Sequence, residues 1–187
     1  MADFAPYRPH DHGRADAQVV IRAASDDDAA TLADLESTVR HTTSSPDAMA
    51  AAIADPQRLV VVAVAGDEVV GWAKTHWWDW SFGPAEAGQY LGGLTVDPRW
   101  RRRGIASTLT GVRMSWIFRR APCAWYVVNA QNLASIDLHR AWGFVEVVRA
   151  EKFHTVRFRG GVGLLLRADA PVEYGDPWRP SVDGDPF

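Results

Sequence analysis

Apolar and polar positions follow two regular periods between residues 19 and 167 of the chain. Alternation with a period of two indicates half-buried strands, and a period near 3.6 indicates helices with one buried face. The two periods follow one another in an order that predicts an α/β domain built around one mixed sheet. We expect strands at 19–23, 59–65, 69–76, 89–96, 125–128 and 144–149, and helices at 25–39, 46–55, 104–120 and 134–142, the first two helices beginning at Ser25 and Ser45.

Turn residues predict two hairpins. Gly66, Asp67 and Glu68 separate the strands at 59–65 and 69–76 and are typical of a short β-turn. The second hairpin is expected to pair 156–158 with 162–167 across Gly160 and Gly161.

Composition places most of the chain in one domain. Of 187 residues, 47% are hydrophobic and 23% charged, which fits a folded globular protein. We expect a polar, flexible leader at 1–18, a domain at 19–170, and a tail rich in Pro, Asp and Gly at 171–187. The single Cys123 excludes an intrachain disulfide, and no apolar run approaches the ~20 residues that span a bilayer. A cytoplasmic protein without membrane attachment is therefore expected.

The net charge of −3 limits the partners that the chain can have. A dedicated nucleic-acid-binding protein is usually basic over a whole face, and this chain is not basic overall. We therefore expect no nucleic-acid partner, and its arginine cluster must serve a local purpose.

That cluster lies between an expected strand and an expected helix, where Arg101, Arg102 and Arg103 precede Gly104. The first N–H groups of a helix lack intrahelical partners and carry the positive end of its dipole, so this turn can bind a phosphate-bearing ligand. The spacing Arg-x-x-Gly-x-Ala, which ends at Ala106, is more informative than the charge. The chain has neither G-x-x-x-x-G-K-[ST] nor a G-x-G-x-x-G after a strand, so a P-loop and a Rossmann site are not expected.

A second motif follows at the expected distance, in the sequence NLASIDLHRAWGF from Asn132 to Phe144. An ordinary amphipathic helix closed by Gly143 explains part of it, but not its pairing with the upstream loop. Together, in this order, the two motifs resemble the patterns Arg/Gln-x-x-Gly-x-Gly/Ala and N-x-x-A/S-x-x-L-Y-x-x-x-G-F of the GNAT superfamily of N-acetyltransferases. The resemblance covers about residues 20–167.

The resemblance implies a central mixed, mostly antiparallel sheet, flanked by helices and splayed between the strands at 89–96 and 125–128. Acetyl-CoA is the implied cosubstrate, held in the splay, and no metal is implied. Gly92 and Gly93 fit a bulge in the first of these strands. The positions that match the cofactor-binding residues of the family are Leu94, Thr95 and Val96 for pantetheine and the thioester; Arg101, Arg102, Arg103, Gly104, Ile105, Ala106 and Ser107 for the pyrophosphate; and Asn132, Ser135 and His139 for the opposite side.

The implied reaction is direct transfer of an acetyl group to an amine in a ternary complex. The family often has a tyrosine as general acid where this chain has His139, whose protonated ring can donate to the leaving thiolate or can simply pack on the cofactor. Tyr126 on the neighbouring strand is the other candidate acid. Glu86 is the first candidate for the base that deprotonates the amine; Asp79, His76 and Glu36 are further candidates, and each of the four can instead be solvated or structural.

An unusual aromatic segment is the candidate acceptor site. It contains Trp72, Trp77, Trp78, Trp80 and Phe82. By analogy it faces the substrate, where aromatic faces attract cations, although core packing or a contact in a homodimer is an equally plain explanation. We expect the acceptor to be a small-molecule amine, cationic and similar to an aminoglycoside or a polyamine. A peptide N-terminus and a lysine side chain are the alternative acceptors. A non-catalytic acyl-CoA-binding or regulatory module is the alternative function.

Overall fold

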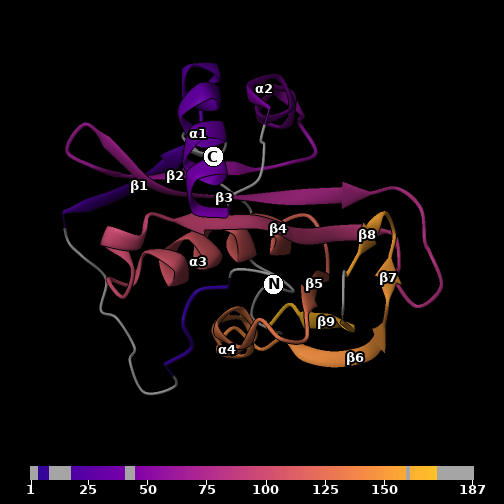
Figure 1. Ribbon diagram of the computed structural model, residues 1–187. Coiled ribbons are helices and arrows are strands. Elements are labelled where there is room, and N and C mark those ends of the chain that lie inside the picture. The colour runs from indigo at the N-terminus through magenta and orange to yellow at the C-terminus, as the bar shows by residue number, and fades with distance from the viewer. Residues whose placement is uncertain (1–3, 9–17, 41–44, 159–160, 172–187) are drawn as a thin grey trace. The chain divides into compact units, whose positions relative to one another are not determined.

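The structure is a computed structural model that describes residues 4–8, 18–40, 45–158 and 161–171 (Figure 1). In this part of the chain seven strands form one sheet in the order β1-β2-β3-β4-β5-β9-β6. These strands are β1 (Val19–Ala23), β2 (Val60–Ala65), β3 (Glu68–Trp78), β4 (Gly88–Val96), β5 (Cys123–Asn129), β6 (Val145–Ala150) and β9 (Gly163–Asp169). The helices are α1 (Ala29–Arg40), α2 (Pro46–Ala54), α3 (Ile105–Phe118) and α4 (Leu133–Arg140), with short 3-10 helices η1 (Asp26–Asp28) and η2 (Pro98–Trp100).

The register of the strands confirms the expected mixed, mostly antiparallel sheet. The pairs β1–β2, β2–β3, β5–β9 and β6–β9 are antiparallel. The pair β4–β5 is parallel, and its register covers only Tyr90 with Trp125 and Leu91 with Tyr126. All the expected strands and helices are present, although most of their ends move by one or two residues.

The described chain divides into two compact units. The N-terminal unit contains residues 18–40, 45–75 and 92–113. The C-terminal unit contains residues 4–8, 76–91, 114–158 and 161–171. The expected leader and tail lie mostly outside the described residues, so the division at 18 and 170 stays a prediction.

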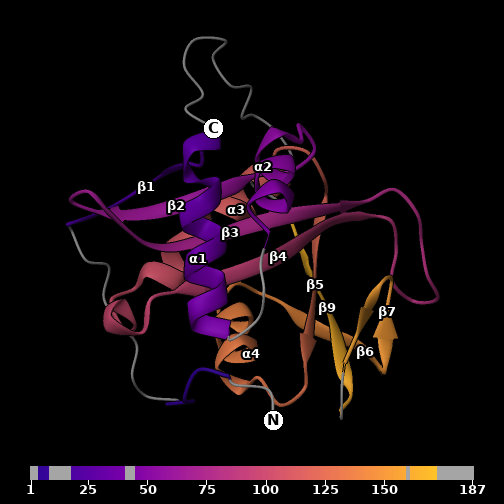
Figure 2. The same ribbon diagram turned by 45° about the horizontal axis from the view of Figure 1, so that its top comes forward.

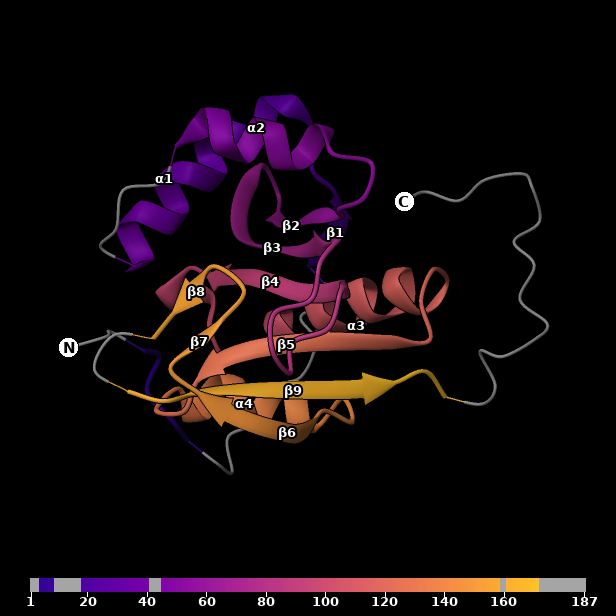
Figure 3. The same ribbon diagram turned by 90° about the vertical axis from the view of Figure 1, so that its right-hand side faces the viewer.

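In the N-terminal unit, α1 and α2 lie side by side over β2 and β3 (Figures 1 and 3). Their apolar faces and the strands form a buried core of Ala29, Leu32, Met49, Ala52, Val60, Val62 and Trp72. The α2 helix begins as the sequence predicts, because the Ser45 hydroxyl accepts a hydrogen bond from the Ala48 N–H and Pro46 occupies the first turn.

The start of the first helix differs from the prediction. Ser25 precedes the 3-10 turn η1 rather than an α-helix, and α1 begins only at Ala29. The Asp28 carboxylate explains the tight turn, because it accepts the Ser25 N–H at 2.7 Å and also holds the Arg22 guanidinium. This ion pair and the bonds from Ser25 lower the pKa of Asp28 to about 2.

In the C-terminal unit, β9 lies between β5 and β6 (Figure 2). The strands β7 (Lys152–Phe153) and β8 (Val156–Arg157) pair in a separate small hairpin (Figure 3). The expected pairing of 156–158 with 162–167 is therefore wrong. Both edges of β9 are already hydrogen-bonded along most of their length, which leaves no edge for β8. Gly160 lies outside the described residues, whereas the Phe158 ring packs directly on Gly163.

Candidate active site

The end of β4 is packed closely against β3 at two glycines. A Cβ atom on Gly92 would come within 3.1 Å of the Lys74 carbonyl oxygen, and one on Gly93 within 3.0 Å of the Trp72 ring. Such Cβ contacts are tighter than most, so a larger residue at either position would require its neighbour to shift by a few tenths of an ångström. The expected bulge at these glycines stays a prediction.

The three residues expected to bind the thioester are the last three residues of β4. Thr95 and Val96 are buried, and Leu94 is half-buried. The Thr95 hydroxyl is buried and has no hydrogen-bond partner among the described residues. A buried hydroxyl without a partner costs free energy, so an acceptor or donor supplied by a ligand would stabilise it.

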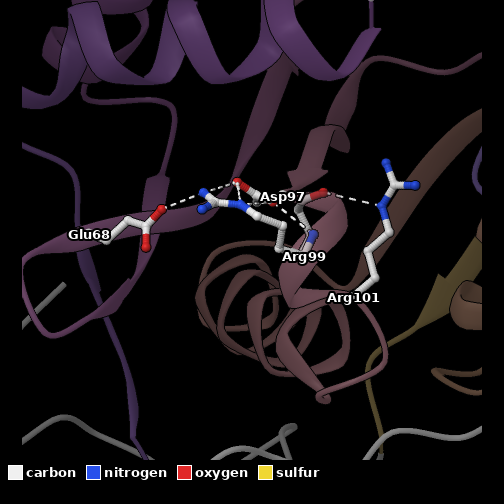
Figure 4. A network of polar contacts seen from close by, with 5 residues as sticks. Glu68, Asp97, Arg99 and Arg101 are labelled. Carbon is white, nitrogen blue, oxygen red and sulfur yellow. Dashed lines mark hydrogen bonds and ion pairs between the residues drawn. The ribbon is translucent and has the colours of Figure 1, made fainter.

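The loop after β4 is tied down by an ionic network (Figure 4). The Arg99 guanidinium lies 2.8 Å from the Asp97 carboxylate and 2.5 Å from that of Glu68. Asp97 also accepts the Arg99 N–H at 2.8 Å, and the ion pair lowers the pKa of Asp97. On the other side of the loop from Glu68, the Arg101 Nε–H donates to the Val96 carbonyl (Figure 4). The chain therefore enters the arginine cluster from a fixed position.

The arginine cluster has a constrained backbone. Arg102 and Gly104 take positive φ angles of 63° and 73°, and α3 begins immediately afterwards at Ile105. A non-glycine residue in this region is uncommon and marks a constrained loop. The N–H groups at the start of α3 and the three arginines fit the pyrophosphate of acetyl-CoA in charge and donor type.

A stacked pair of rings dominates the second motif. The His139 and Tyr126 rings lie face to face, with centroids 3.8 Å apart, and both side chains are buried. The Tyr126 hydroxyl lies 2.6 Å from the Ser135 hydroxyl, and His139 Nδ1 lies 2.7 Å from the Ser135 carbonyl oxygen. Because a carbonyl only accepts, Nδ1 must carry a proton, so the neutral ring presents Nε2 as an acceptor.

Asn132 has a structural task in addition to its predicted one. Its side-chain oxygen accepts the Ser135 N–H at 3.3 Å and caps α4. Asn132, Ser135, His139 and Tyr126 thus form one contiguous set in the C-terminal unit.

The candidate base Glu86 is exposed and lies in the segment before β4. Its backbone carbonyl accepts the Tyr90 hydroxyl at 2.6 Å, and burial raises the pKa of Tyr90. His154, which the sequence analysis did not single out, lies with Nε2 3.1 Å from that hydroxyl. His154 is buried, has a φ of 48°, and its pKa is lowered by burial. The positive φ angle of His154 is unusual for a residue other than glycine, and no sequence pattern predicts it.

The aromatic segment divides into core and surface. Trp72 is fully buried in the N-terminal core, which corrects its assignment to the acceptor site. Trp78 stacks on His154 with centroids 4.6 Å apart, whereas Trp80 and Phe82 are each 39% exposed. The Lys152 ammonium lies 4.8 Å from the centre of the Phe82 ring. Trp78, Trp80, Phe82 and His154 form a partly exposed aromatic cluster in the C-terminal unit.

The sequence-predicted site residues thus fall into two groups. Leu94 to Val96 and Arg101 to Ser107 belong to the N-terminal unit, and Glu86, Tyr126, Asn132, Ser135 and His139 to the C-terminal unit. The cofactor-binding and catalytic roles of these residues stay predictions.

Comparison with known protein families assigns the chain to one of them. Residues 27–144 match the model of the acetyltransferase (GNAT) family. The match covers more than half of the chain, so the protein belongs to this family. No curated protein sequence matches the chain significantly.

Solved structures with the same fold include several N-acetyltransferases. The ribosomal-protein-S18-alanine N-acetyltransferase from Escherichia coli is 18% identical with a TM-score of 0.65, and the match covers 81% of this chain and 93% of that one. A ribosomal-protein-alanine N-acetyltransferase from Brucella melitensis is 21% identical, with a TM-score of 0.67 and coverage of 81% and 99%. NAA60 from Arabidopsis thaliana, solved with acetyl-CoA, is 16% identical, with a TM-score of 0.67 and coverage of 81% and 98%. At these identities the likeness shows the fold.

Family and fold together define the protein as an acetyl-CoA-dependent N-acetyltransferase. Within the described residues no group of three or more His, Cys, Asp or Glu could hold a metal ion. None of the helices in the described ranges is long and apolar enough to cross a membrane.

Proposed function

We propose that the protein transfers the acetyl group of acetyl-CoA to a primary amine of a small, cationic molecule. The observation that carries this proposal is the partly exposed pair Trp80 and Phe82, with the exposed carboxylates of Asp79 and Glu86 in the same segment. Aromatic faces and carboxylates both attract an ammonium group. The position of Lys152 over Phe82 supports this chemistry, since one ring of the cluster already lies near an ammonium ion.

The reaction requires a neutral amine and a proton for the leaving thiolate. The amine nitrogen bonds to the acetyl carbon as the carbon–sulfur bond breaks; the amine loses one proton and the CoA thiolate gains one. Acetyl-CoA supplies the activated acyl group, held by the backbone of Leu94 to Val96 and by the loop from Arg101 to Ser107. Glu86 is the proposed base for the amine.

Tyr126 is a better proposed acid than His139. Its hydroxyl carries the proton to be donated and is oriented by Ser135 at 2.6 Å. His139 donates through Nδ1 to a helix carbonyl, so only its protonated ring could donate from Nε2, whereas the phenol of Tyr126 carries its proton in the neutral form. Stacked on Tyr126, the imidazole fixes the position of the phenol ring. We therefore propose a positioning role for His139.

A protein N-terminus is the second candidate acceptor. The structures from Escherichia coli and Brucella melitensis are named as enzymes that acetylate an alanine of a ribosomal protein. An N-terminal amine needs the same deprotonation and the same transfer step, so only binding outside the reaction centre separates the two acceptors. A cytoplasmic location and a homodimer also remain proposals from the sequence.

Acetyl-CoA consumption across a panel of amines tests the proposal. Polyamines and aminoglycosides are compared with short peptides, using the wild type, Trp80→Ala and Trp142→Ala. Trp142 is the matched control, because it is 38% exposed, like Trp80, but lies outside the aromatic cluster. We expect turnover of a small cationic amine whose KM rises with Trp80→Ala alone. Turnover of peptides only would refute the small-amine proposal and establish the second candidate.

A further inference from the structure

A buried arginine of α3 joins the helix to the strand that packs against β4. Arg113 is 0% exposed, and its guanidinium donates hydrogen bonds to α3 and to β3. Nε donates to the Leu109 carbonyl at 3.2 Å and Nη2 to the Thr110 hydroxyl at 3.1 Å, while Nη1 reaches the Lys74 carbonyl of β3 at 3.1 Å. The bonds to Leu109 and Thr110 thus hold the guanidinium against α3, and the bond to Lys74 connects it to β3.

The Thr110 hydroxyl makes this arrangement rigid. It donates to the Ala106 carbonyl at 2.8 Å while it accepts from Arg113. Ala106 lies in the first turn of α3, directly after the arginine cluster. The guanidinium is therefore linked through one hydroxyl to the start of the helix expected to hold the pyrophosphate.

The carbonyl that Arg113 holds is also the carbonyl against which Gly92 packs. A Cβ atom on Gly92 would lie 3.1 Å from that oxygen of Lys74. A shift of the Lys74 peptide toward β4 would therefore press on the β4 backbone at Gly92, two residues before Leu94. Burying a guanidinium is costly, so an apolar side chain of similar size would satisfy packing alone at least as well.

We propose that Arg113 is a positioning residue for acetyl transfer: it fixes the Lys74 carbonyl, and through it the β4 backbone at Gly92, so that Leu94 to Val96 can polarise the thioester carbonyl. The inference rests on the proposed placement of the thioester along these three residues. Misplacing a reacting group by about 1 Å can cost about a hundredfold in rate, which makes a residue that sets this distance important.

The experiment compares Arg113→Met and Arg113→Lys with Arg120→Met. Arg120 is the matched control, because it also donates to the carbonyl four residues earlier in the chain, that of Trp116 at 3.1 Å. We measure kcat, the Kd for acetyl-CoA, and the ¹³C chemical shift of the carbonyl in bound [1-¹³C]acetyl-CoA. That shift reports polarisation of the thioester, which a loss of stability alone does not change.

For Arg113→Met we expect kcat to fall roughly ten- to a hundredfold with Kd changed by less than about threefold. The carbonyl signal should return toward its position in free acetyl-CoA. Arg113→Lys should recover part of both effects, and Arg120→Met should leave them unchanged. If Arg113→Met does not fold, Thr110→Val removes the hydroxyl that orients Nη2 and should move both readouts in the same direction to a smaller extent.

Two results would overturn the inference. They differ in whether the proposed placement of the thioester on β4 also fails. A folded Arg113→Met protein with unchanged kcat and carbonyl signal shows that Arg113 is only structural, and the placement of the thioester survives. A wild-type carbonyl signal that does not move on binding shows that β4 does not polarise the thioester, and the placement fails with it.

Discussion

Two buried histidines in the C-terminal unit show how similar environments serve different ends. His139 in α4 is 2% exposed and stacks on Tyr126; His154 in the turn between β7 and β8 is 1% exposed and stacks on Trp78. His139 bonds to a carbonyl of its own helix, next to a hydroxyl proposed to react. His154 bonds to the Tyr90 hydroxyl, which itself donates to the Glu86 carbonyl.

The difference lies in what each ring holds in place. His139 has ordinary helical geometry and orients one neighbouring side chain. His154 has a φ of 48° and joins the β7–β8 turn to the segment before β4. Backbone strain of this kind persists only where surrounding contacts enforce it. We infer that His139 serves catalysis and that His154 holds the loop containing Glu86 in place.

Removing the hydroxyl near each histidine gives the largest expected contrast. Tyr126→Phe should lower kcat about a hundredfold, because a general acid contributes at least that much. Tyr90→Phe should lower kcat far less, because it only loosens the segment that carries Glu86, and should cost about 1 kcal/mol of unfolding free energy, the value of one buried hydrogen bond. Steady-state kinetics and urea unfolding of both variants check this, and equal losses of kcat would end the distinction.

Replacing the first ring tests whether His139 positions Tyr126 or acts as an acid. His139→Ala leaves a cavity beside Tyr126 and should lower the unfolding free energy by about 2–4 kcal/mol. His139→Phe restores the stacked ring without a titratable group. If His139 is a positioning residue, kcat of the phenylalanine variant should stay within about tenfold of wild type. A loss as large as that of Tyr126→Phe would instead make His139 the acid.

The second ring should give the protein an acid-sensitive stability. Burial lowers the pKa of His154, so between that value and about 6.5 the unfolded chain binds a proton that the folded chain does not. The contribution of His154 to stability is thus fully present above about pH 6.5 and is lost as the pH falls through this window. His154→Asn keeps a residue that tolerates positive φ and should flatten this slope.

The pH experiment has an internal reference. Asp28 has a pKa of about 2 in the folded protein, so its contribution is lost only as the pH falls below about 4. Urea unfolding between pH 5 and 8 therefore leaves Asp28 out of the comparison. An unchanged slope in His154→Asn would show that His154 does not titrate across unfolding.

The smallest expected effect concerns Lys152, whose ammonium group lies over Phe82 in the aromatic cluster that contains His154. Lys152→Met removes the ammonium ion over Phe82, and at this partly exposed site the change should cost about 0.5 kcal/mol of stability. Because the vacated ring face can then attract the acceptor, the KM for a cationic amine should fall about twofold. A higher KM would show instead that Lys152 helps to bind the acceptor.

The sequence predicted the order of helices and strands because local periods and caps encode it. The sequence also placed Ser135 and His139 one turn apart on the same helix, whereas their contacts with Tyr126 of β5 came only from the structure. It failed for the hairpin at 156–158, since a short strand pairs with whichever edge is open, and the edges of β9 are occupied.

The sequence by itself determined the class of the protein, because the arginine loop and the second motif depend on spacing along the chain. Only the tertiary structure separated Trp72 from Trp80, or brought His154 to Tyr90 across 64 positions. The contact of Arg113 with the Lys74 carbonyl likewise spans 39 positions. Such contacts depend on how strands and helices pack, and packing is set by the whole core rather than by neighbours in the sequence.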